Sequence, residues 1–243
     1  MEELKQPSFA DASAREPGTL HPITLALEEI YAIFAKQGFS IATGPELEDE
    51  WHNFDALNVP KDHPARDMQD TFFIKGKPGF VMRTHTSPVQ IRFMKENTPP
   101  FAIVAPGKVF RNESTDATHE MQFHQIEGLV VGENITVEHL KGTLLSFFKE
   151  FFGEETEIRL RPSFFPFVEP GFEVDARVGD RWLEIGGAGM VHPHVFEAVG
   201  YDPKQVTGFA FGVGVDRLAN VTFGISDVRL GYQGDLRINQ WGK

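Results

Sequence analysis

KVFRNESTDATHEMQFHQIEGLVV, residues 108–131, is the stretch that decides the fold. Its pattern predicts two apolar strands, Phe101–Phe110 and Met121–Val131, joined by a polar loop. Two neighbouring strands with a loop between them favour an antiparallel hairpin. The rest of the chain must therefore supply the strands and helices that cover it.

Two charged residues of this hairpin allow two interpretations. Arg111 closes the first strand, and Glu127 lies among apolar residues of the second. A guanidinium presents a rigid fork of donors that matches phosphate or carboxylate, so Arg111 before a flexible polar loop indicates a polyphosphate clamp. Arg111 can equally pair with Glu127 across the hairpin as a structural bridge. The segment alone leaves both interpretations open.

Composition predicts a folded globular protein. The chain has 243 residues, of which 41% are hydrophobic and 12% aromatic. No run of about 18 apolar residues occurs, and the acidic N-terminus lacks an apolar stretch, so we expect neither a membrane span nor a signal peptide. We expect a cytoplasmic protein with a flexible polar leader at residues 1–19 and one catalytic domain at residues 20–243.

Cysteine count and charge exclude several classes of chemistry. With no cysteine, disulfides, thiolate catalysis and Cys-based zinc sites are excluded. The formal net charge is -12, whereas chains that wrap nucleic acid are usually basic. If RNA binds, a partner or a local basic patch must supply most of the contacts to its backbone.

Helical and alternating patterns predict an α+β fold. The most regular helix begins at Pro22 and stops at Gly38. Further helices are expected at 47–57, 88–96, 136–152 and 193–199, and after Gly214, while strands are expected at 39–43, 71–74, 80–83, 158–161, 173–178 and 181–185. Asn58–Asp70 is expected to be a long ordered loop.

The start of the helix at 88–96 has a structural explanation. Ser87 precedes Pro88, and Gln90 follows three positions after Ser87, which is the spacing of a capping box with proline in the first turn. The cap explains Ser87 and Gln90 without any ligand. It leaves the polar cluster Thr84, His85 and Thr86 unexplained at the end of a strand, where pockets often lie.

The aromatic run SFFPFVEPG, residues 163–171, also allows two interpretations. Its prolines predict that it lies outside the central strands of a sheet. Phe164, Phe165 and Phe167 therefore form either a plug in the core or the wall of a pocket for an aromatic ligand, because rings pack well edge to face. Nearby, His192 and His194 lack a third ligand at a recognisable spacing, so a metal site is the weaker interpretation there.

A glycine-rich strand near the C-terminal end leads into a helix that carries Arg217 in its first turn. The spacing of Gly208, Gly212 and Gly214 does not fit the dinucleotide fingerprint GxGxxG. The helix dipole disfavours a cation in the first turn, so Arg217 is expected to bind an anion. Arg111 and Arg217 are thus expected to hold the two ends of a triphosphate.

The chain resembles the class II aminoacyl-tRNA synthetases. VFRNESTDATHEMQFHQIEGL is similar to motif 2, GFAFGVGVDRLA is similar to motif 3, and the unit at 22–45 resembles motif 1. The blocks HPIT, GPELE, NFDALNVPKDHPARDMQDTF, RTHTSPVQIR, LKGTL, FFPFVEPG and GGAGMVHP resemble the catalytic module of the bacterial phenylalanyl-tRNA synthetase alpha subunit. The resemblance covers residues 20 to about 237 and implies an antiparallel sheet flanked by helices, with the first helix at a subunit interface.

The resemblance also implies two sets of binding residues. For ATP, the motif 2 arginine holds the α-phosphate, a histidine and the motif 3 arginine hold the distal phosphates, and an aromatic ring stacks on adenine. These residues correspond to Arg111, Glu113, His119, Phe123 and Arg217, with the two arginines also catalytic. The phenylalanine-binding set, from polar head to ring, is His85, Ser87, Gln90, Gln125, Glu127, Glu169, Phe165, Phe167, Val168, Ala210 and Gly212.

The implied reaction activates L-phenylalanine with ATP and Mg²⁺ and transfers it to the 3′ end of tRNA(Phe), with a beta subunit as partner. Family alpha subunits begin with a helical arm, which is missing here, since about 19 polar residues precede the HPIT block. A stand-alone adenylating paralogue is therefore an alternative, and a non-catalytic regulatory homologue is another. The presence of Arg111, His119 and Arg217 disfavours the last of these.

Overall fold

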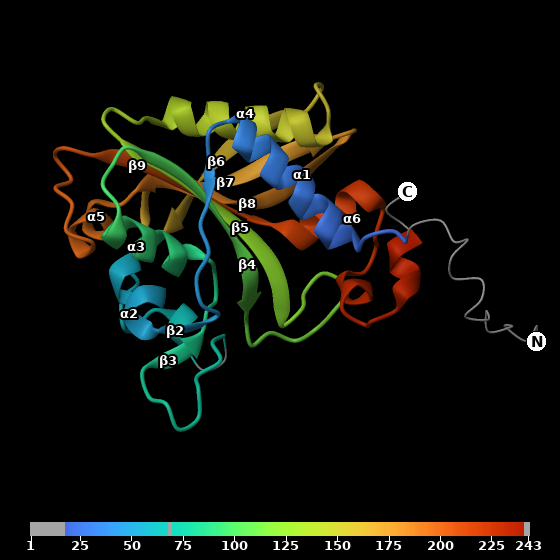
Figure 1. Ribbon diagram of the computed structural model, residues 1–243, viewed down its shortest axis with the longest axis horizontal. Coiled ribbons are helices and arrows are strands. Elements are labelled where there is room, and N and C mark those ends of the chain that lie inside the picture. The colour runs from blue at the N-terminus through green and yellow to red at the C-terminus, as the bar shows by residue number, and fades with distance from the viewer. Residues whose placement is uncertain (1–17, 68–69, 241–243) are drawn as a thin grey trace, which may run out of the picture.

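A seven-stranded sheet forms the centre of the molecule (Figure 1). The computed structural model describes residues 18–67 and 70–240. The strand order is β1 (Ser40–Ile41), β4 (Phe101–Phe110), β5 (Gln122–Gly132), β9 (Thr207–Gly214), β8 (Arg181–Val191), β7 (Val168–Val178) and β6 (Glu157–Phe165). β1 runs parallel to β4, and every other neighbouring pair is antiparallel. The predicted α+β class, an antiparallel sheet flanked by helices, is confirmed.

Helices cover both sides of this sheet (Figure 1). One group shares a core cluster and comprises α1 (Pro22–Lys36), α4 (Val137–Phe152) and α6 (Val215–Phe223). The second group packs with a small sheet and comprises α2 (Glu50–Asn53), α3 (Ser87–Glu96), α5 (Pro193–Ala198), β2 (Leu47–Asp49) and β3 (Phe80–Met82). Short 3₁₀ turns lie at Asp55–Leu57 (η2), Pro64–Arg66 (η3), Val228–Gly231 (η4) and Leu236–Gln240 (η5).

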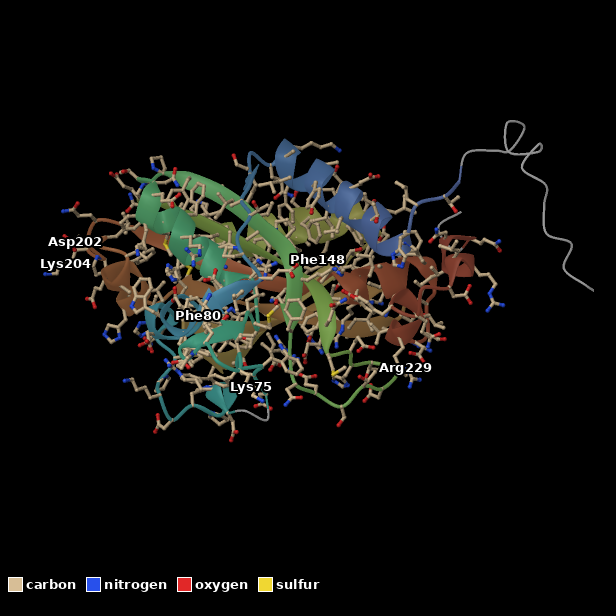
Figure 2. The ribbon with its side chains drawn as sticks, turned by 60° about the horizontal axis from the view of Figure 1, so that its bottom comes forward. Lys75, Phe80, Phe148, Asp202, Lys204 and Arg229 are labelled. Atoms are coloured by element: carbon tan, nitrogen blue, oxygen red, sulfur yellow. The ribbon has the colours of Figure 1, made fainter. Side chains whose placement is uncertain are left out.

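Phenylalanine rings fill the first core cluster. Phe34 of α1 stacks on Phe147 of α4 with ring centroids 4.6 Å apart, and on Phe211 of β9 at 5.5 Å. Figure 2 labels the fully buried Phe148 near the centre of the molecule, whereas Lys75 and Lys204 lie at its periphery. Burial of each such ring contributes about 1.5–3 kcal/mol to the stability of the fold. The rings therefore hold α1 and α4 against one face of the sheet.

The opening hairpin of the sequence forms as predicted. β4 and β5 pair along their whole length, with Ala105 opposite Glu127 and Gly107 opposite Gln125. Arg111 extends the pair because its N–H donates to the carbonyl of Met121 at 2.9 Å. Since alternate residues of a strand share a face, Gln125 and Glu127 point to the same side of the sheet.

Two predicted elements are wrong. The segment 47–57 is not one helix but β2, the single turn α2 and η2. Asp49 ends β2 and caps α2, since its carboxylate accepts from the N–H of His52 at 2.8 Å, and Asn58 ends η2 in the left-handed region. In the expected strand 71–74, Phe73 forms an isolated bridge with Val81, and no regular strand extends from it.

The aromatic run lies partly in the sheet: residues 163–165 end the edge strand β6, residues 168–171 begin β7, and Pro166 lies in the turn between them. The expectation that its prolines keep it out of the central strands is therefore wrong for β7, which lies between β6 and β8. Pro162 lies in β6, an edge strand, where a missing N–H costs no ladder bond on the solvent side. Pro170 lies in β7 where the register shifts between Val168 and Gly171. A bulge is the other place where a strand accommodates proline.

The predicted helices α1, α3, α4 and α5 hold within about two residues, as does the turn Gly179–Asp180 between β7 and β8. The strands expected at 158–161, 173–178 and 181–185 form but are longer than predicted: β6 ends at Phe165, β7 begins at Val168 and β8 ends at Val191. Residues 1–17 of the expected leader lie outside the described residues. Thr19 is described, and its hydroxyl donates to the carbonyl of Asn239 at 2.5 Å. Among the described residues, no helix has the length and apolar character that crossing a membrane requires.

Candidate active site

A cavity of about 1040 Å³ opens on the sheet. Its wall comes from α3, the loop 112–121 and strands β5, β7, β8 and β9, with the first turns of α6 at one end. Ligand cavities usually measure about 300–1,000 Å³, so this one has room for more than one small molecule. Every residue of the two predicted binding sets lines it except Glu169.

A buried carboxylate lies at the centre of the wall. Glu127 is 4% exposed, and its two oxygens accept from the Thr86 N–H at 3.0 Å, the Ser87 hydroxyl at 2.6 Å and the Gln90 amide at 2.6 Å. Burial raises the pKa of Glu127, while the bonds from Ser87, Gln90 and Thr86 oppose that rise. The site therefore stabilises an anion that has given up most of its water.

These bonds correct the capping-box interpretation. α3 begins at Ser87, and Thr86 is its cap residue without a side-chain cap bond. Ser87 and Gln90 both reach Glu127 because residues three apart in a helix lie on the same face, nearly one turn from each other. The proposed bridge between Arg111 and Glu127 is not among the ion pairs of the described residues, so the carboxylate belongs to α3 and the cavity.

Two buried polar atoms of the cavity wall have no hydrogen-bond partner within the described chain: His85 Nδ1 and Gln125 Oε1. Burial, together with the nearby cations Arg111 and Arg83, lowers the pKa of His85 to about 3. The imidazole is therefore neutral at physiological pH, and Nδ1 can accept a hydrogen bond. A buried orphan costs free energy, so these two atoms and Glu127 together favour a ligand that brings several donors, such as an ammonium group.

An apolar slot lies beside this polar end. The rings of Phe165 and Phe167 lie 6.0 Å apart, and the Phe167 ring is 6.2 Å from that of His85. Gly187 permits this arrangement, because a Cβ there would lie 2.9 Å from the Phe165 ring. The predicted lining residues Val168, Ala210 and Gly212 complete the slot.

Neither ring is a core plug, so that interpretation is wrong. Both line the cavity, and Phe164 lies at its wall too, with 81% of its surface exposed. Gly212 marks where the slot meets the polar end, since a Cβ there would lie 2.8 Å from Gln125 Nε2 and 3.3 Å from Glu127 Cγ. The slot therefore tolerates no side chain at position 212 without displacing both.

Arg111 lines the same cavity and is held by three contacts. Its Nε donates to the carbonyl of Thr84 at 3.2 Å, its Nη1 is 3.9 Å from Glu113, and its guanidinium lies 5.0 Å from the centroid of the Phe123 ring. Burial lowers the pKa of Arg111, and Glu113 and Glu127 oppose that effect. The contacts orient the fork while leaving donors free to bind an anion.

The loop between the strands presents His119. Asp116 organises it by accepting from the N–H of Thr118 at 2.7 Å and of His119 at 2.8 Å. The His119 imidazole keeps 54% of its surface exposed, with Nδ1 3.1 Å from Asp116. The ring is thus oriented by its carboxylate neighbour, and its Nε2 is directed away from Asp116.

Arg217 enters the same cavity from the first turn of α6, as predicted. Its Nη1 donates to the carbonyl of Glu184 on β8 at 2.6 Å. The bond leaves the other guanidinium donors for a ligand. Glu184 also lines the cavity, with a side chain 55% exposed. Because Glu184 lies next to Arg217, its carboxylate is at the end of the cavity where Arg217 is expected to bind an anion.

Sequence reasoning missed three contributors. The Thr84 carbonyl and Thr86 N–H act through the backbone, which side-chain identity does not reveal, although both belong to the polar cluster noted at 84–86. Glu184 follows no recognisable motif. Conversely, Glu169 is 75% exposed and lies 3.4 Å from His192, outside the cavity wall.

Two groups of candidate metal donors lie outside the cavity wall. Within the described residues, Glu48, Asp49 and His52 form a group close enough to hold an ion. Arg92 already donates two hydrogen bonds of 2.9 and 2.6 Å to the Glu48 carboxylate, so Glu48 belongs to a salt bridge and not to a metal site. His192 caps α5 by accepting from the N–H of His194, which explains the histidine pair structurally.

Comparison with known proteins shows the family of the chain. Residues 8–241 match the family described as tRNA synthetases class II core domain (F). The chain is 53% identical over 238 residues to a phenylalanine--tRNA ligase alpha subunit from Lawsonia intracellularis, covering 90% of this chain and 68% of that protein. It is 54% identical over 235 residues to the one from Syntrophus aciditrophicus, covering 92% and 69%.

A solved structure gives independent support for the fold. The chain superposes on a pyrrolysyl-tRNA synthetase from Desulfitobacterium hafniense with a TM-score of 0.69 and 19% identity, covering 93% of this chain and 76% of that one. At that identity the likeness concerns the fold alone. The chain belongs to the class II tRNA synthetase family, and within it to the group of the phenylalanine--tRNA ligase alpha subunits.

Proposed function

We propose that the chain is a cytoplasmic phenylalanine--tRNA ligase subunit whose catalytic domain, residues 20–243, activates L-phenylalanine with ATP and passes it to the 3′ end of tRNA(Phe). The observation that carries the proposal is the buried Glu127 with the orphaned acceptors His85 Nδ1 and Gln125 Oε1 beside an apolar slot. An α-amino acid with an aromatic side chain satisfies both halves: its ammonium donates to the acceptors, and its ring enters the slot.

ATP would lie along the other end of the cavity. Arg111 would hold the α-phosphate, His119 and Arg217 the distal phosphates, and Phe123 the adenine. Glu113 would contact the nucleotide. The three cationic or polar groups come from the end of β4, the loop 112–121 and α6, so they surround the cavity from separate directions. Such a set stabilises a triphosphate without a dedicated phosphate loop.

The reaction then needs no protein nucleophile. The carboxylate oxygen of phenylalanine attacks the α-phosphorus, an O–P bond forms, and the bond to the β-phosphate breaks with release of pyrophosphate. Residues of this chain act by fixing the carboxylate near the phosphorus and by stabilising the charge that develops on the α-phosphate, which is the role of Arg111. In the second step a ribose hydroxyl of the terminal tRNA nucleotide attacks the adenylate.

Mg²⁺ fits the donor chemistry of the nucleotide end. This ion prefers oxygen ligands and is usually held by one or two carboxylates together with substrate phosphates. The carboxylate of Glu184 is the candidate ligand because it is exposed to the cavity beside Arg217, and among the described residues only one of its oxygens, Oε2, lies near an arginine, at 3.3 Å from Arg161. When bound, the ion would neutralise charge on the phosphates.

The test is amino-acid-dependent exchange between ATP and labelled pyrophosphate. The full chain is assayed with phenylalanine, tyrosine and leucine, then with tRNA, alone and with a co-produced beta subunit. Exchange that requires phenylalanine supports the proposal, and tRNA charging that requires the beta subunit supports that partner. Exchange without charging under any condition contradicts the tRNA step, and absence of exchange in every combination contradicts the whole assignment.

A further inference from the structure

The structure brings a tyrosine from outside every binding motif to the back of the nucleotide end. Tyr232 follows η4, and its hydroxyl donates to Asp216 Oδ1 at 2.5 Å. Asp216 immediately precedes Arg217 in the first turn of α6. The other oxygen of Asp216 accepts from the backbone N–H of His124 at 2.6 Å. One carboxylate thus joins the helix start, strand β5 and the C-terminal segment.

The same hydroxyl also reaches the His124 side chain. Tyr232 Oη lies 3.1 Å from His124 Nδ1, and the two rings stack 6.3 Å apart with an interplanar angle of 12°. A tyrosine hydroxyl has one proton to donate, and Tyr232 donates it to Asp216 in a hydrogen bond. The hydrogen between His124 and Tyr232 therefore belongs to Nδ1. This gives a continuous chain of donors from His124 through Tyr232 to Asp216.

His124 lies between Phe123 and Gln125 on β5. Because successive side chains of a strand point to opposite faces, His124 lies behind the cavity wall when Phe123 and Gln125 face the cavity. The network therefore joins two supports of the nucleotide end from behind: the strand that carries Phe123 and the helix turn that carries Arg217.

The segment that bears Tyr232 makes a second contact with the nucleotide end. The N–H of Val228 donates to the carbonyl of Ala117 at 3.0 Å. Ala117 belongs to the loop that carries His119, and Figure 1 shows this loop running beside the C-terminal segment, drawn in red. Residues 228–232 thus contact the loop, the strand and the helix that supply the phosphate-binding and adenine-binding groups.

We propose that Tyr232 is a positioning residue of the nucleotide site, acting through Asp216 and His124 to set Arg217 relative to Phe123. The inference rests on the proposed function for its substrate, ATP, and adds a residue that the motifs do not contain. Tyr232 does not line the cavity, so a loss of its hydroxyl affects ATP through the network and leaves the phenylalanine slot in place.

The chain offers a matched control in Tyr201. Its hydroxyl is also hydrogen-bonded, to the carbonyl of Met94 at 2.7 Å, and lies outside the nucleotide end. Tyr232→Phe and Tyr201→Phe each remove one bonded hydroxyl and keep the ring. Thermal unfolding midpoints of both variants measure the structural cost, and calorimetric titration with MgATP measures nucleotide affinity without requiring turnover.

The expected result for Tyr232→Phe is a rise of about 2- to 30-fold in the Kd and KM for ATP, with the KM for phenylalanine unchanged. Tyr201→Phe is expected to lower the unfolding midpoint comparably without that rise. Asp216→Asn, which keeps the shape of the side chain, is expected to weaken ATP binding, and the double variant Asp216→Asn with Tyr232→Phe is expected to be non-additive.

An unchanged ATP Kd in Tyr232→Phe, or an equal change in Tyr201→Phe, overturns the inference. Additive effects of Asp216→Asn and Tyr232→Phe overturn it too, because the two residues would then act separately. The outcome is distinguishable from failure of the proposed function. A wild-type chain that binds MgATP but shows no phenylalanine-dependent exchange contradicts the proposed reaction, while the titrations still decide the role of Tyr232.

Discussion

Ser87 donates its hydroxyl to Glu127 over 2.6 Å and so ties the first turn of α3 to the middle of β5. Burial raises the pKa of Glu127, and the bond from Ser87 opposes that rise at the place where the amino group of the substrate is proposed to bind. The same bond also means that a serine with the sequence context of a helix cap belongs to the wall of the cavity. Four predictions follow from this site, each with its own measurement.

Ser87→Ala is expected to raise the KM for phenylalanine about 10-fold and to leave the KM for ATP unchanged. Removing one donor leaves Glu127 with less compensation for its burial, so its pKa rises further and its anion binds ammonium less well. Pyrophosphate exchange at varied phenylalanine checks this. Ser146→Ala, an exposed serine on α4, is the control. Equal KM values for phenylalanine in the two variants contradict the assigned role.

Arg111→Ala is expected to reduce the rate of adenylate formation by about 100- to 1,000-fold or more, because the α-phosphate loses its charged donor in the transition state. Single-turnover formation of phenylalanyl-adenylate measures this step directly. Arg237→Ala removes an arginine that is 86% exposed and pairs with Asp235, so it controls for the change in net charge. Near-normal adenylate formation in Arg111→Ala is the contradictory result.

Ala210→Gly is expected to admit para-substituted phenylalanines, because removing the methyl group enlarges the slot near the substrate ring. Ala210→Val is expected to exclude phenylalanine itself. An apolar pocket rejects an added hydroxyl only about 100-fold, so tyrosine activation is a sensitive measure of the change. Ala102→Gly makes the same substitution on β4 outside the cavity wall. Unchanged discrimination in both Ala210 variants contradicts this position for the ring.

Stability is expected to fall as the pH is lowered from about 6.5 toward 4. In the folded chain the pKa of His85 is about 3 and that of His124 about 4, in both cases chiefly because of burial. Since an unfolded histidine titrates near 6.5, the unfolded state binds more protons at these two histidines in this window, and each contributes a slope of up to about 1.4 kcal/mol per pH unit. Glu127 and Asp216, whose pKa burial raises, contribute slopes of the opposite sign.

Urea unfolding between pH 4.5 and 7.5 measures that slope. The free energy of unfolding is expected to rise with pH and to level off above about 6.5. His85→Gln removes one of these two buried histidines, so its slope is expected to be smaller than that of the wild type. A slope that is equal in the two proteins contradicts the buried neutral state of His85.

The sequence predicted those parts of the fold whose cause is local. α1, α4 and the β4–β5 hairpin have clear periodicity, and their boundaries hold within about two residues. Pro170 of the aromatic run misled because a proline at a register shift of a strand and one in a loop have the same local signature, and strand order is a property of the whole fold. The segment 47–57 failed because the side chain of Asp49 redirects the chain after three strand residues.

The same distinction between local and non-local causes applies to the residues of the site. The positions of Arg111, Arg217 and the aromatic pair came from motifs, and their convergence on one cavity required the structure. Ser87 and Gln90 looked like a cap because the spacing that suits an N-terminal cap also suits two donors above a neighbouring strand. Tyr232 was missed because its partners lie 16 and 108 residues away along the chain.

The central position of β9 bears on how the chain folds. This strand is the last along the described residues, yet it pairs with β5 on one side and β8 on the other. Two half-sheets, one ending at β5 and one at β8, each keep an unpaired edge until β9 arrives between them. Such non-local pairing slows folding and leaves strand edges exposed to misassembly during synthesis. Because Ala210 and Gly212 lie on β9, the amino-acid slot forms only in the step that joins the halves, and a chain stalled before that step has neither a continuous sheet nor a substrate pocket.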